Sequence, residues 1–195
     1  MSRTLVVTAL RTERAALYRH VAGAVLECSG MGADRARRWS PAGDRARLAG
    51  AVIAGLGGAL DPQLRAGDVV VATSVCDALG SIELPCAGQL AERLADAGHP
   101  VHVGPIVTSP HVVTRGAERE RLAATGAIAL DMESSVLART LLTLVPVGVV
   151  RIIVDTPTRP LLHLATISAG IASLRRLRAI GPIIGCWEGP RDAAS

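Results

Sequence analysis

Short runs of valine, isoleucine and alanine recur along the chain, separated by segments whose apolar residues have helical spacing. A strand that is buried on both faces reads as a continuous apolar run, so this pattern predicts an α/β domain with a largely buried sheet. The runs predict strands at residues 4–10, 51–56, 68–75, 101–108, 127–130 and 145–154.

Helices are predicted between these runs. Residues 11–21 and 89–97 carry alanine, leucine and valine at helical spacing, and Gly98 is placed to end the second of these helices. Thr114 is predicted to cap a charged helix that runs through residue 123, and Asp131 to cap a helix that runs to residue 142.

The length of 195 residues fits one domain, predicted at residues 1–188 with a frayed tail at 189–195. The chain has no lysine, so all 21 basic side chains are arginines, and they are scattered along the sequence. Proteins that bind nucleic acid usually cluster their basic charge and supply aromatic rings for stacking. Here the aromatic residues are Trp39, Trp187 and Tyr18 alone. We therefore expect no nucleic-acid partner.

The apolar runs also bear on location. The run before Arg11 is too short for a secretory signal, which predicts a cytoplasmic protein. Every apolar run is broken before about 18 residues, so no transmembrane segment is expected. The longest uncharged stretch near the C-terminus lies between Arg159 and Arg175. It predicts a buried helix, an oligomer contact or a peripheral membrane contact, in that order.

Cysteine and histidine are spaced without any metal-binding pattern, so no metal is expected and the thiols are predicted to be reduced packing residues. The residues concerned are Cys28, Cys76, Cys86, Cys186, His20, His99, His102, His111 and His163. The chain has one local cluster of basic residues, which we interpret as a solvated face in preference to a phosphate site. It consists of Arg35, Arg37, Arg38, Arg45 and Arg47.

Candidate chemistry lies where polar residues or glycines follow the predicted strands, the edge at which α/β folds usually build their sites. Two glycine segments, Ser29–Gly32 and Gly55–Pro62, allow close backbone approach to a ligand but equally suit tight turns. Glu13 is either a site carboxylate or a solvated acid in the first turn of a helix. Asp155 ends the most hydrophobic strand, where it is either a buried functional acid or the cap of the Thr-Pro turn that follows.

Taken together and in order, these motifs resemble the nucleoside phosphorylase and nucleosidase superfamily, which implies a three-layer α/β/α fold with a mixed central sheet. The branch most similar is the one associated with hopanoid biosynthesis, which acts on adenosylhopane, followed by methylthioadenosine/S-adenosylhomocysteine nucleosidases. The motifs are Ala9–Glu13, Ser29–Gly32, Gly55–Pro62 running into Arg65–Val71, Asp131–Ser134 and Arg151–Asp155.

The resemblance implies a role for each motif. Asp155 is the expected general acid, which protonates the leaving purine. Glu133 is expected to accept hydrogen bonds from the ribose hydroxyls while Met132 packs against the sugar. Glu13 and Arg151 are expected to orient the nucleophile. The remaining residues expected to contact substrate are Ala9, Gly57, Gly58, Val112 and Val113.

The chain departs from the hydrolytic nucleosidases at several positions. It carries Leu56 and Val154 where they have serine, and Val112 near the position of their purine-stacking aromatic residue. The segment 75–89 is short where relatives build a lid, which fits a large apolar group on the ribose 5′ position. His111 is expected beside the base pocket.

We therefore predict an enzyme that releases adenine from an adenosine-type nucleoside with a large apolar 5′ substituent, by phosphorolysis. The first alternative is hydrolysis of methylthioadenosine or S-adenosylhomocysteine, and the second is a nucleoside-binding protein without catalysis. Retention of all four charged site residues argues against a pure binder. No organic cofactor is expected, and phosphate would be a co-substrate. The resemblance also implies a homo-oligomer, with residues 160–174 as a buried contact.

Overall fold

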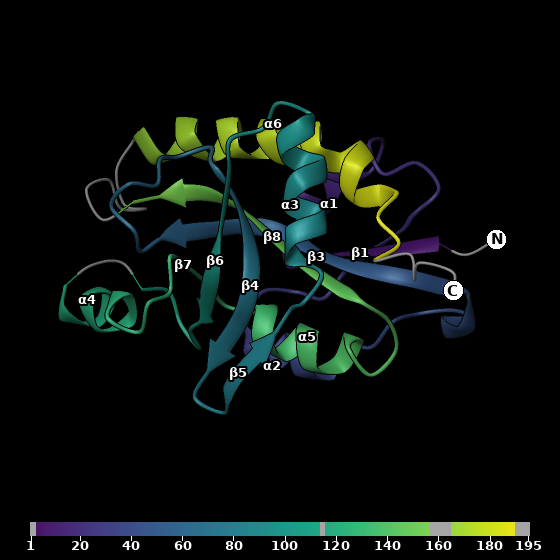
Figure 1. Cartoon of the computed structure of the whole chain (residues 1–195), viewed down its shortest axis with the longest axis horizontal. Coiled ribbons are helices and arrows are strands. Elements are labelled where there is room, and N and C mark those ends of the chain that lie inside the picture. The colour runs from purple at the N-terminus through teal and green to yellow at the C-terminus, as the bar shows by residue number, and fades with distance from the viewer. Residues whose placement is uncertain (1–2, 114–115, 157–164, 190–195) are drawn as a thin grey trace.

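The computed structural model describes residues 3–113, 116–156 and 165–189, with the backbone alone at 165–169. These residues form eight strands and six α-helices, which alternate except that β3, β4 and β5 follow one another directly (Figure 1). The strands are β1 (Arg3–Thr8), β2 (Val25–Cys28), β3 (Leu48–Ala59), β4 (Val69–Asp77), β5 (Gly80–Glu83), β6 (Val101–Thr108), β7 (Ala129–Asp131) and β8 (Val147–Asp155). The helices are α1 (Arg11–Leu17), α2 (Ala33–Arg38), α3 (Ala87–Asp96), α4 (Ala117–Ala123), α5 (Ser134–Leu141) and α6 (Ala165–Gly185), with a 3₁₀ turn at Arg45–Arg47.

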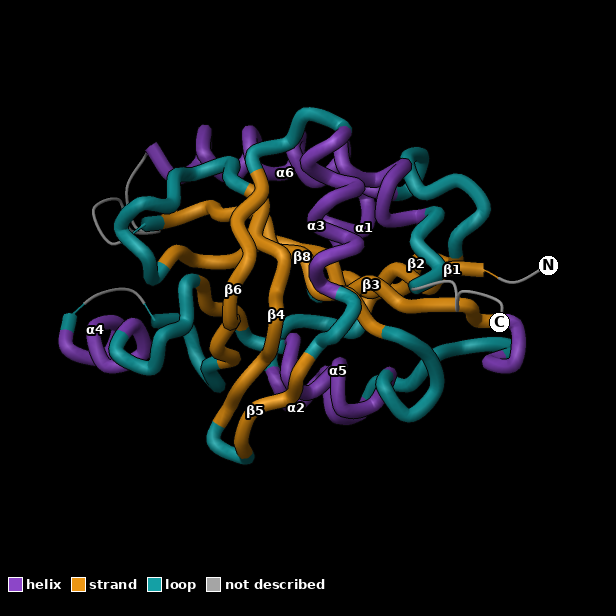
Figure 2. The backbone as a smooth tube through the Cα atoms, viewed as in Figure 1, coloured by secondary structure: helices purple, strands orange, loops and turns teal. Residues whose placement is uncertain are grey.

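All eight strands belong to one mixed sheet in the order β2-β1-β3-β7-β6-β4-β5, with β8 between β3 and β4 (Figure 2). β8 is parallel to β3 and antiparallel to β4, and β7 is antiparallel to β3 and parallel to β6. Because β4 also pairs with β6, the pairings β3-β8-β4-β6-β7-β3 close into a ring. β3 and β8 are therefore paired on both sides, β3 with β1, β7 and β8, and β8 with β3 and β4.

Helices cover both faces of this sheet. α1, α3 and α6 lie on one side and α2 and α5 on the other, while α4 stands apart beside β7 (Figure 1). Alternate residues of β1 divide between the two cores, as a strand requires. Val6 belongs to the core that also holds residues of α1, α3 and α6, whereas Leu5 and Val7 belong to the core that holds residues of α2 and α5. These layers confirm the predicted α/β class and the mixed sheet.

The strands predicted from apolar runs are all present, with ends shifted by a few residues. Three elements were not predicted from the sequence, and they are β2, β5 and α2. Each is short, and β5 contains one large apolar residue, Ile82, so none produces a periodic signal. The first predicted helix ends at Leu17, four residues before the predicted end.

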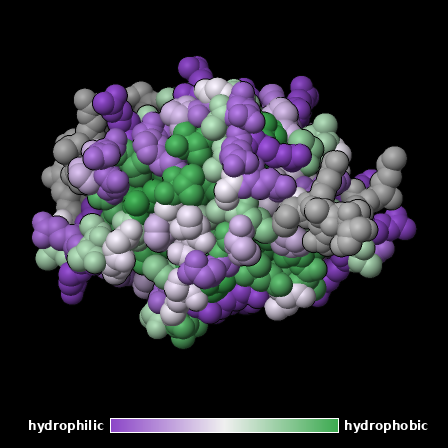
Figure 3. All heavy atoms as spheres, in the orientation of Figure 1, coloured by the Kyte–Doolittle hydropathy of each residue, from purple (hydrophilic) through white to green (hydrophobic). Residues whose placement is uncertain are grey.

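The surface carries several exposed apolar side chains. On the face in Figure 3, hydrophobic residues lie among hydrophilic ones across the middle of the molecule. The exposed set includes Tyr18, Met31, Leu79, Val103 and Ile171. The homo-oligomer with a contact at residues 160–174 stays a prediction, because residues 160–164 and the side chains of 165–169 lie outside the described residues. Within the described chain, no helix has the length and hydropathy to cross a membrane.

Candidate functional site

Arg151 on β8 is the centre of a buried polar network. Its side chain is 1% exposed, and its Nε atom donates to Oδ2 of Asp131 at 2.8 Å. Nη2 donates to Oγ of Ser134 at 2.9 Å and lies 3.9 Å from Oε2 of Glu133. Because a buried guanidinium needs paired charges and hydrogen bonds, the Asp131–Ser134 motif can be read as its binding site.

Asp131 was expected as the cap of the helix that follows, but the N-cap residue of α5 is Glu133, and Asp131 ends β7 two residues before it. Its Oδ1 accepts the backbone N–H groups of Glu133 at 3.2 Å and Ser134 at 3.1 Å, and the hydroxyl of Thr108 at 2.8 Å. Burial acts to raise the pKa of Asp131, but Arg151 and these hydrogen bonds outweigh it and hold the pKa below its usual value. Asp131 thus joins the start of α5 to Arg151.

Glu13 is buried and tied to backbone, so it is not a solvated acid of the first turn. Its Oε2 accepts the N–H groups of Ala9 at 3.1 Å and Leu10 at 2.8 Å, and its Oε1 accepts the N–H of Leu56 at 2.8 Å. Burial raises the pKa of Glu13, with Arg151 and the three N–H groups opposing the rise. The backbone of Leu56 therefore contacts the site through Glu13.

The glycines of β3 lie close to this machinery. A Cβ atom at Gly55 would be 2.5 Å from Nη1 of Arg151 and 2.8 Å from Oε1 of Glu13. A Cβ at Gly57 would be 3.0 Å from the carbonyl oxygen of Leu130. Side chains at these positions would collide with their neighbours, so the close packing of the site explains why the segment is glycine.

Glu133 is held by the loop that follows β2. Its Oε1 accepts the backbone N–H of Gly32 at 2.6 Å, which joins the Ser29–Gly32 motif to the Asp131–Ser134 motif. Burial, partly opposed by Arg151, raises the pKa of Glu133 to about 7. Met132 next to it is partly exposed. The two motifs thus form one wall of the site.

Asp155 pairs with a residue that the sequence analysis did not single out. Its Oδ2 accepts from Nη1 of Arg119 on α4 at 2.8 Å, and both side chains are buried. Nε and Nη2 of Arg119 donate to the carbonyl oxygen of Ala59. The β3–β8 register shifts between Gly57 and Gly58, which places Gly58 opposite Asp155. Burial raises the pKa of Asp155, and Arg119 opposes the rise.

Val112 and Val113, which are expected on the base side of the site, differ in how far they are buried. Val113 is buried in a small cluster with Leu60 and Leu130, while Val112 is 49% exposed. His111 is exposed, and its Nε2 lies 2.8 Å from Glu118 of α4. Contact of the two valines with a purine stays a prediction.

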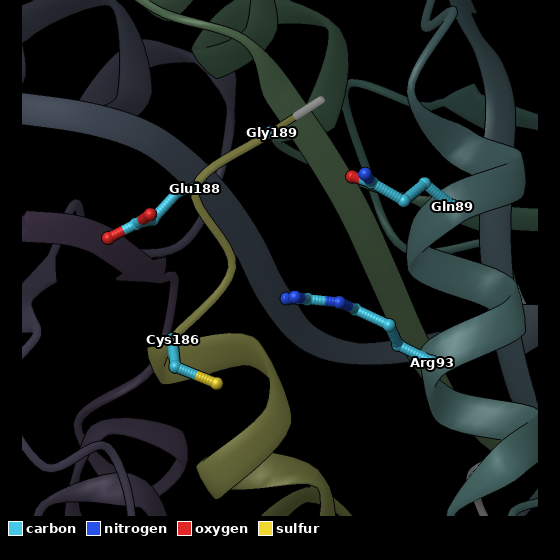
Figure 4. A pocket seen from close by; sticks show the side chains of 5 residues that line it. All are labelled: Gln89, Arg93, Cys186, Glu188 and Gly189. Carbon is cyan, nitrogen blue, oxygen red and sulfur yellow. The ribbon is translucent and has the colours of Figure 1, made fainter. Parts of the chain in front are cut away.

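Two surface pockets lie away from this network. One of about 200 Å³ lies between α3 and the chain after α6, where Arg93 and Cys186 point inward and Glu188 points away (Figure 4). The other, of about 380 Å³, is lined by residues of β1, β2 and the segment before β3, among them Arg3 and Glu27. Neither contains a residue of the network around Arg151. In the described parts of the chain, no group of three His, Cys, Asp or Glu side chains is placed to hold a metal ion.

Residues 10–180 match the family model described as the phosphorylase superfamily. The chain belongs to this superfamily. Membership confirms the resemblance drawn from the motifs and the expectation of an enzyme of the nucleoside phosphorylase and nucleosidase kind. Closeness to the hopanoid branch stays a prediction. Comparison with curated proteins finds no match to this phosphorylase-superfamily chain.

Solved structures share the fold of this phosphorylase-superfamily chain at low identity. A 5′-methylthioadenosine/S-adenosylhomocysteine nucleosidase from Campylobacter jejuni is 17% identical with a TM-score of 0.80, covering 95% of this chain and 99% of that one. The corresponding nucleosidase from S. pneumoniae is 19% identical with a TM-score of 0.78, covering 95% and 99%. Futalosine hydrolase from Helicobacter pylori is 14% identical with a TM-score of 0.77, covering 94% and 97%.

Proposed function

We propose that this protein releases adenine from an adenosine-type nucleoside by cleaving its N-glycosidic bond. The observation that carries the proposal is the layout along the β3 glycines. Glu13 and Arg151 lie at Gly55, and Asp155 lies at Gly58. Three residues of extended strand span about 10 Å, which is room for a ribose between a nucleophile at one end and a base at the other.

In this proposal Asp155 is the general acid that protonates the leaving base. Cleavage of the bond leaves negative charge on the purine and positive charge on the ribose, so a proton delivered to the base lowers the barrier. A carboxyl can hold that proton near neutral pH only when burial raises its pKa, which is the direction found for Asp155.

Glu133 is the group to bind the ribose hydroxyls. Gly32 fixes one of its oxygens, and Met132 precedes it on the same turn. A fixed carboxylate that accepts hydrogen bonds from the sugar also stabilises positive charge as it develops there. Gly57, Gly58 and Ala9 complete this side through their backbone.

Glu13 is the group to activate the nucleophile. Its carboxylate accepts three backbone N–H groups, and an ionised carboxylate has about four acceptor positions, so one remains for a water molecule. The raised pKa of Glu13 favours removal of a proton from that water. Arg151 lies beside it at Gly55 and orients the attacking oxygen.

The charges favour water over phosphate. Glu13, Asp131 and Glu133 surround Arg151, so three carboxyl groups face one guanidinium. Asp131 already pairs with that guanidinium at 2.8 Å. A phosphate dianion entering here would meet more negative than positive charge. Hydrolysis, the alternative to the phosphorolysis expected from the sequence, is therefore the reaction we propose.

A large apolar 5′ substituent, as in adenosylhopane, remains our proposal for the substrate. It is supported by Met31, which is 50% exposed and precedes the Gly32 that binds Glu133. An apolar side chain beside the ribose-binding carboxylate offers contact area to a hydrophobic group.

The test is adenine release from adenosine, from methylthioadenosine and from an adenosine with a bulky apolar 5′ group, each with and without phosphate. We expect release that does not depend on phosphate, fastest with the bulky compound. Strict dependence on phosphate would establish phosphorolysis instead. Absence of release from all three substrates would contradict the proposal and favour a binding protein.

A further inference from the structure

Arg119 differs from the other basic residue of its helix. α4 has the sequence Ala-Glu-Arg-Glu-Arg-Leu-Ala, in which Arg119 and Arg121 are two positions apart. Arg121 is exposed, whereas Arg119 is 5% exposed and turns toward the end of β8. An arginine buried in this way loses hydration, so its contacts have to replace that hydration.

The contacts of Arg119 include one oxygen of the acid and a backbone carbonyl of β3. Nη1 donates to Oδ2 of Asp155 at 2.8 Å, while Nε and Nη2 donate to the carbonyl oxygen of Ala59 on β3. The planar guanidinium therefore ties the end of β8 to β3 in a fixed orientation. The other carboxyl oxygen, Oδ1, lies where a Cβ at Gly58 would be 2.7 Å away. That oxygen faces the glycine segment.

We propose that Arg119 is a positioning residue for the general acid, holding Oδ2 of Asp155 so that Oδ1 presents its proton to the leaving base. The inference rests on the proposed function. Arg119 does not contact the reacting atoms in this arrangement, and it acts through Asp155.

Proton transfer from Asp155 accompanies cleavage of the N-glycosidic bond. The proton on Oδ1 passes to a base nitrogen, and the electron pair of the N-glycosidic bond leaves with the base as that bond breaks. Water adds its oxygen to the ribose carbon, and Glu13 takes the proton that the water loses. Asp155 becomes a carboxylate, and the charge that appears on it is next to the guanidinium of Arg119.

Arg119 also sets how readily Asp155 gives up its proton. Burial raises the pKa of Asp155 and so favours the neutral acid. Among the described residues around Asp155, Arg119 is the charged group that lowers this pKa. From β3, the neighbours are Gly58 and the carbonyl of Ala59, which do not titrate. Removal of the guanidinium would therefore raise the pKa of Asp155, because an adjacent arginine lowers the pKa of an aspartate by about one to three pH units.

The experiment compares Arg119→Gln, Arg119→Lys and the matched control Arg121→Gln in adenine release. A general acid must be protonated, so activity falls at high pH, and the pH profile of kcat/KM reports that limb for the free enzyme. Arg119→Gln should lose about tenfold or more in kcat and move the alkaline limb upward by about one pH unit or more. Arg119→Lys keeps the charge and should leave the limb in place with a smaller loss of kcat. Arg121→Gln should match the wild type.

An alkaline limb that stays in place in a folded Arg119→Gln variant would overturn the proposal, whatever the loss of activity, because a purely structural arginine would also reduce activity. Should Arg119→Gln not fold, Arg119→Lys decides, since it loses the two-point contact to Asp155 and Ala59. An unchanged kcat in that variant would overturn the proposal. Failure of the wild type to release adenine would instead remove the proposed function on which the inference rests.

Discussion

The backbone N–H of Gly32 donates a 2.6 Å hydrogen bond to Oε1 of Glu133, so the loop after β2 fixes a carboxyl group at the start of α5. The other carboxyl oxygen of Glu133 lies 3.9 Å from Nη2 of Arg151. The bond makes the glycine segment part of the site, and it means that Glu133 is oriented before any substrate binds. Orientation in advance reduces the entropy lost on binding.

Glu133 gives the protein a dependence of stability on pH. Its pKa is about 7 in the folded protein, above its ordinary value of 4.5. Between these values the folded state binds more protons than the unfolded state, so the free energy of unfolding falls as the pH rises. Glu133→Gln removes this titration. Relative to wild type, the variant should gain on the order of 3 kcal/mol from about pH 4 to about pH 8 in urea unfolding.

The comparison of variant with wild type isolates this group, because Glu13, whose pKa is also raised, titrates in both proteins. Exposed Glu92→Gln on α3 serves as the matched control and should leave the pH dependence as it is in wild type. A difference between Glu133→Gln and wild type that stays constant across the pH range would show that Glu133 titrates normally.

The buried pair of Arg151 and Asp131 should matter far more to stability than an exposed pair. Arg151→Met leaves Asp131 and its neighbouring carboxyl groups without their cation, which should cost about 3–5 kcal/mol in the free energy of unfolding. Arg37→Met breaks the exposed pair with Asp34 and should cost about 1 kcal/mol or less. Equal losses in chemical denaturation would refute the reading of Arg151 as the centre of a buried network.

Gly58 should be sensitive to a single added methyl group. A Cβ there would lie 2.7 Å from Oδ1 of Asp155, so Gly58→Ala has to displace the acid. We expect a loss of about tenfold or more in kcat. Gly88→Ala in α3 meets no atom within 4 Å and should keep full activity, with stability raised by up to about 1 kcal/mol. Full activity in Gly58→Ala would place the reacting oxygen elsewhere.

The fold was largely predictable because its strands are apolar on both faces. Runs such as 68–75 and 145–154 are recognisable without context, and the structure has β4 and β8 there. β2 was not predicted, since the strand has only four residues and all four are only partly buried. Nothing local in the sequence shows that β8 lies between β3 and β4, because strand order depends on contacts between distant segments.

The site was predictable only in part. The family resemblance pointed to Glu13, Glu133, Arg151 and Asp155. Residue type and spacing alone left Glu13 open as a solvated acid of a first helical turn and Asp155 open as the cap of a turn. Arg119 was not predictable, since it stands in a charged helix where nothing local distinguishes it from Arg121. The hydrogen bond from Gly32 to Glu133 joins residues 101 positions apart and uses a backbone group, which leaves no mark on residue type.

The most direct test of the account is adenine release by Asp155→Asn beside wild type, with exposed Asp96→Asn on α3 as the matched control. Asparagine keeps an oxygen for Arg119 but carries no acidic proton, so the variant should melt close to wild type. Its kcat should fall by about a hundredfold or more. Asp96→Asn should behave as wild type. Full turnover in a folded Asp155→Asn variant would contradict the assignment of Asp155 as the acid that releases the base.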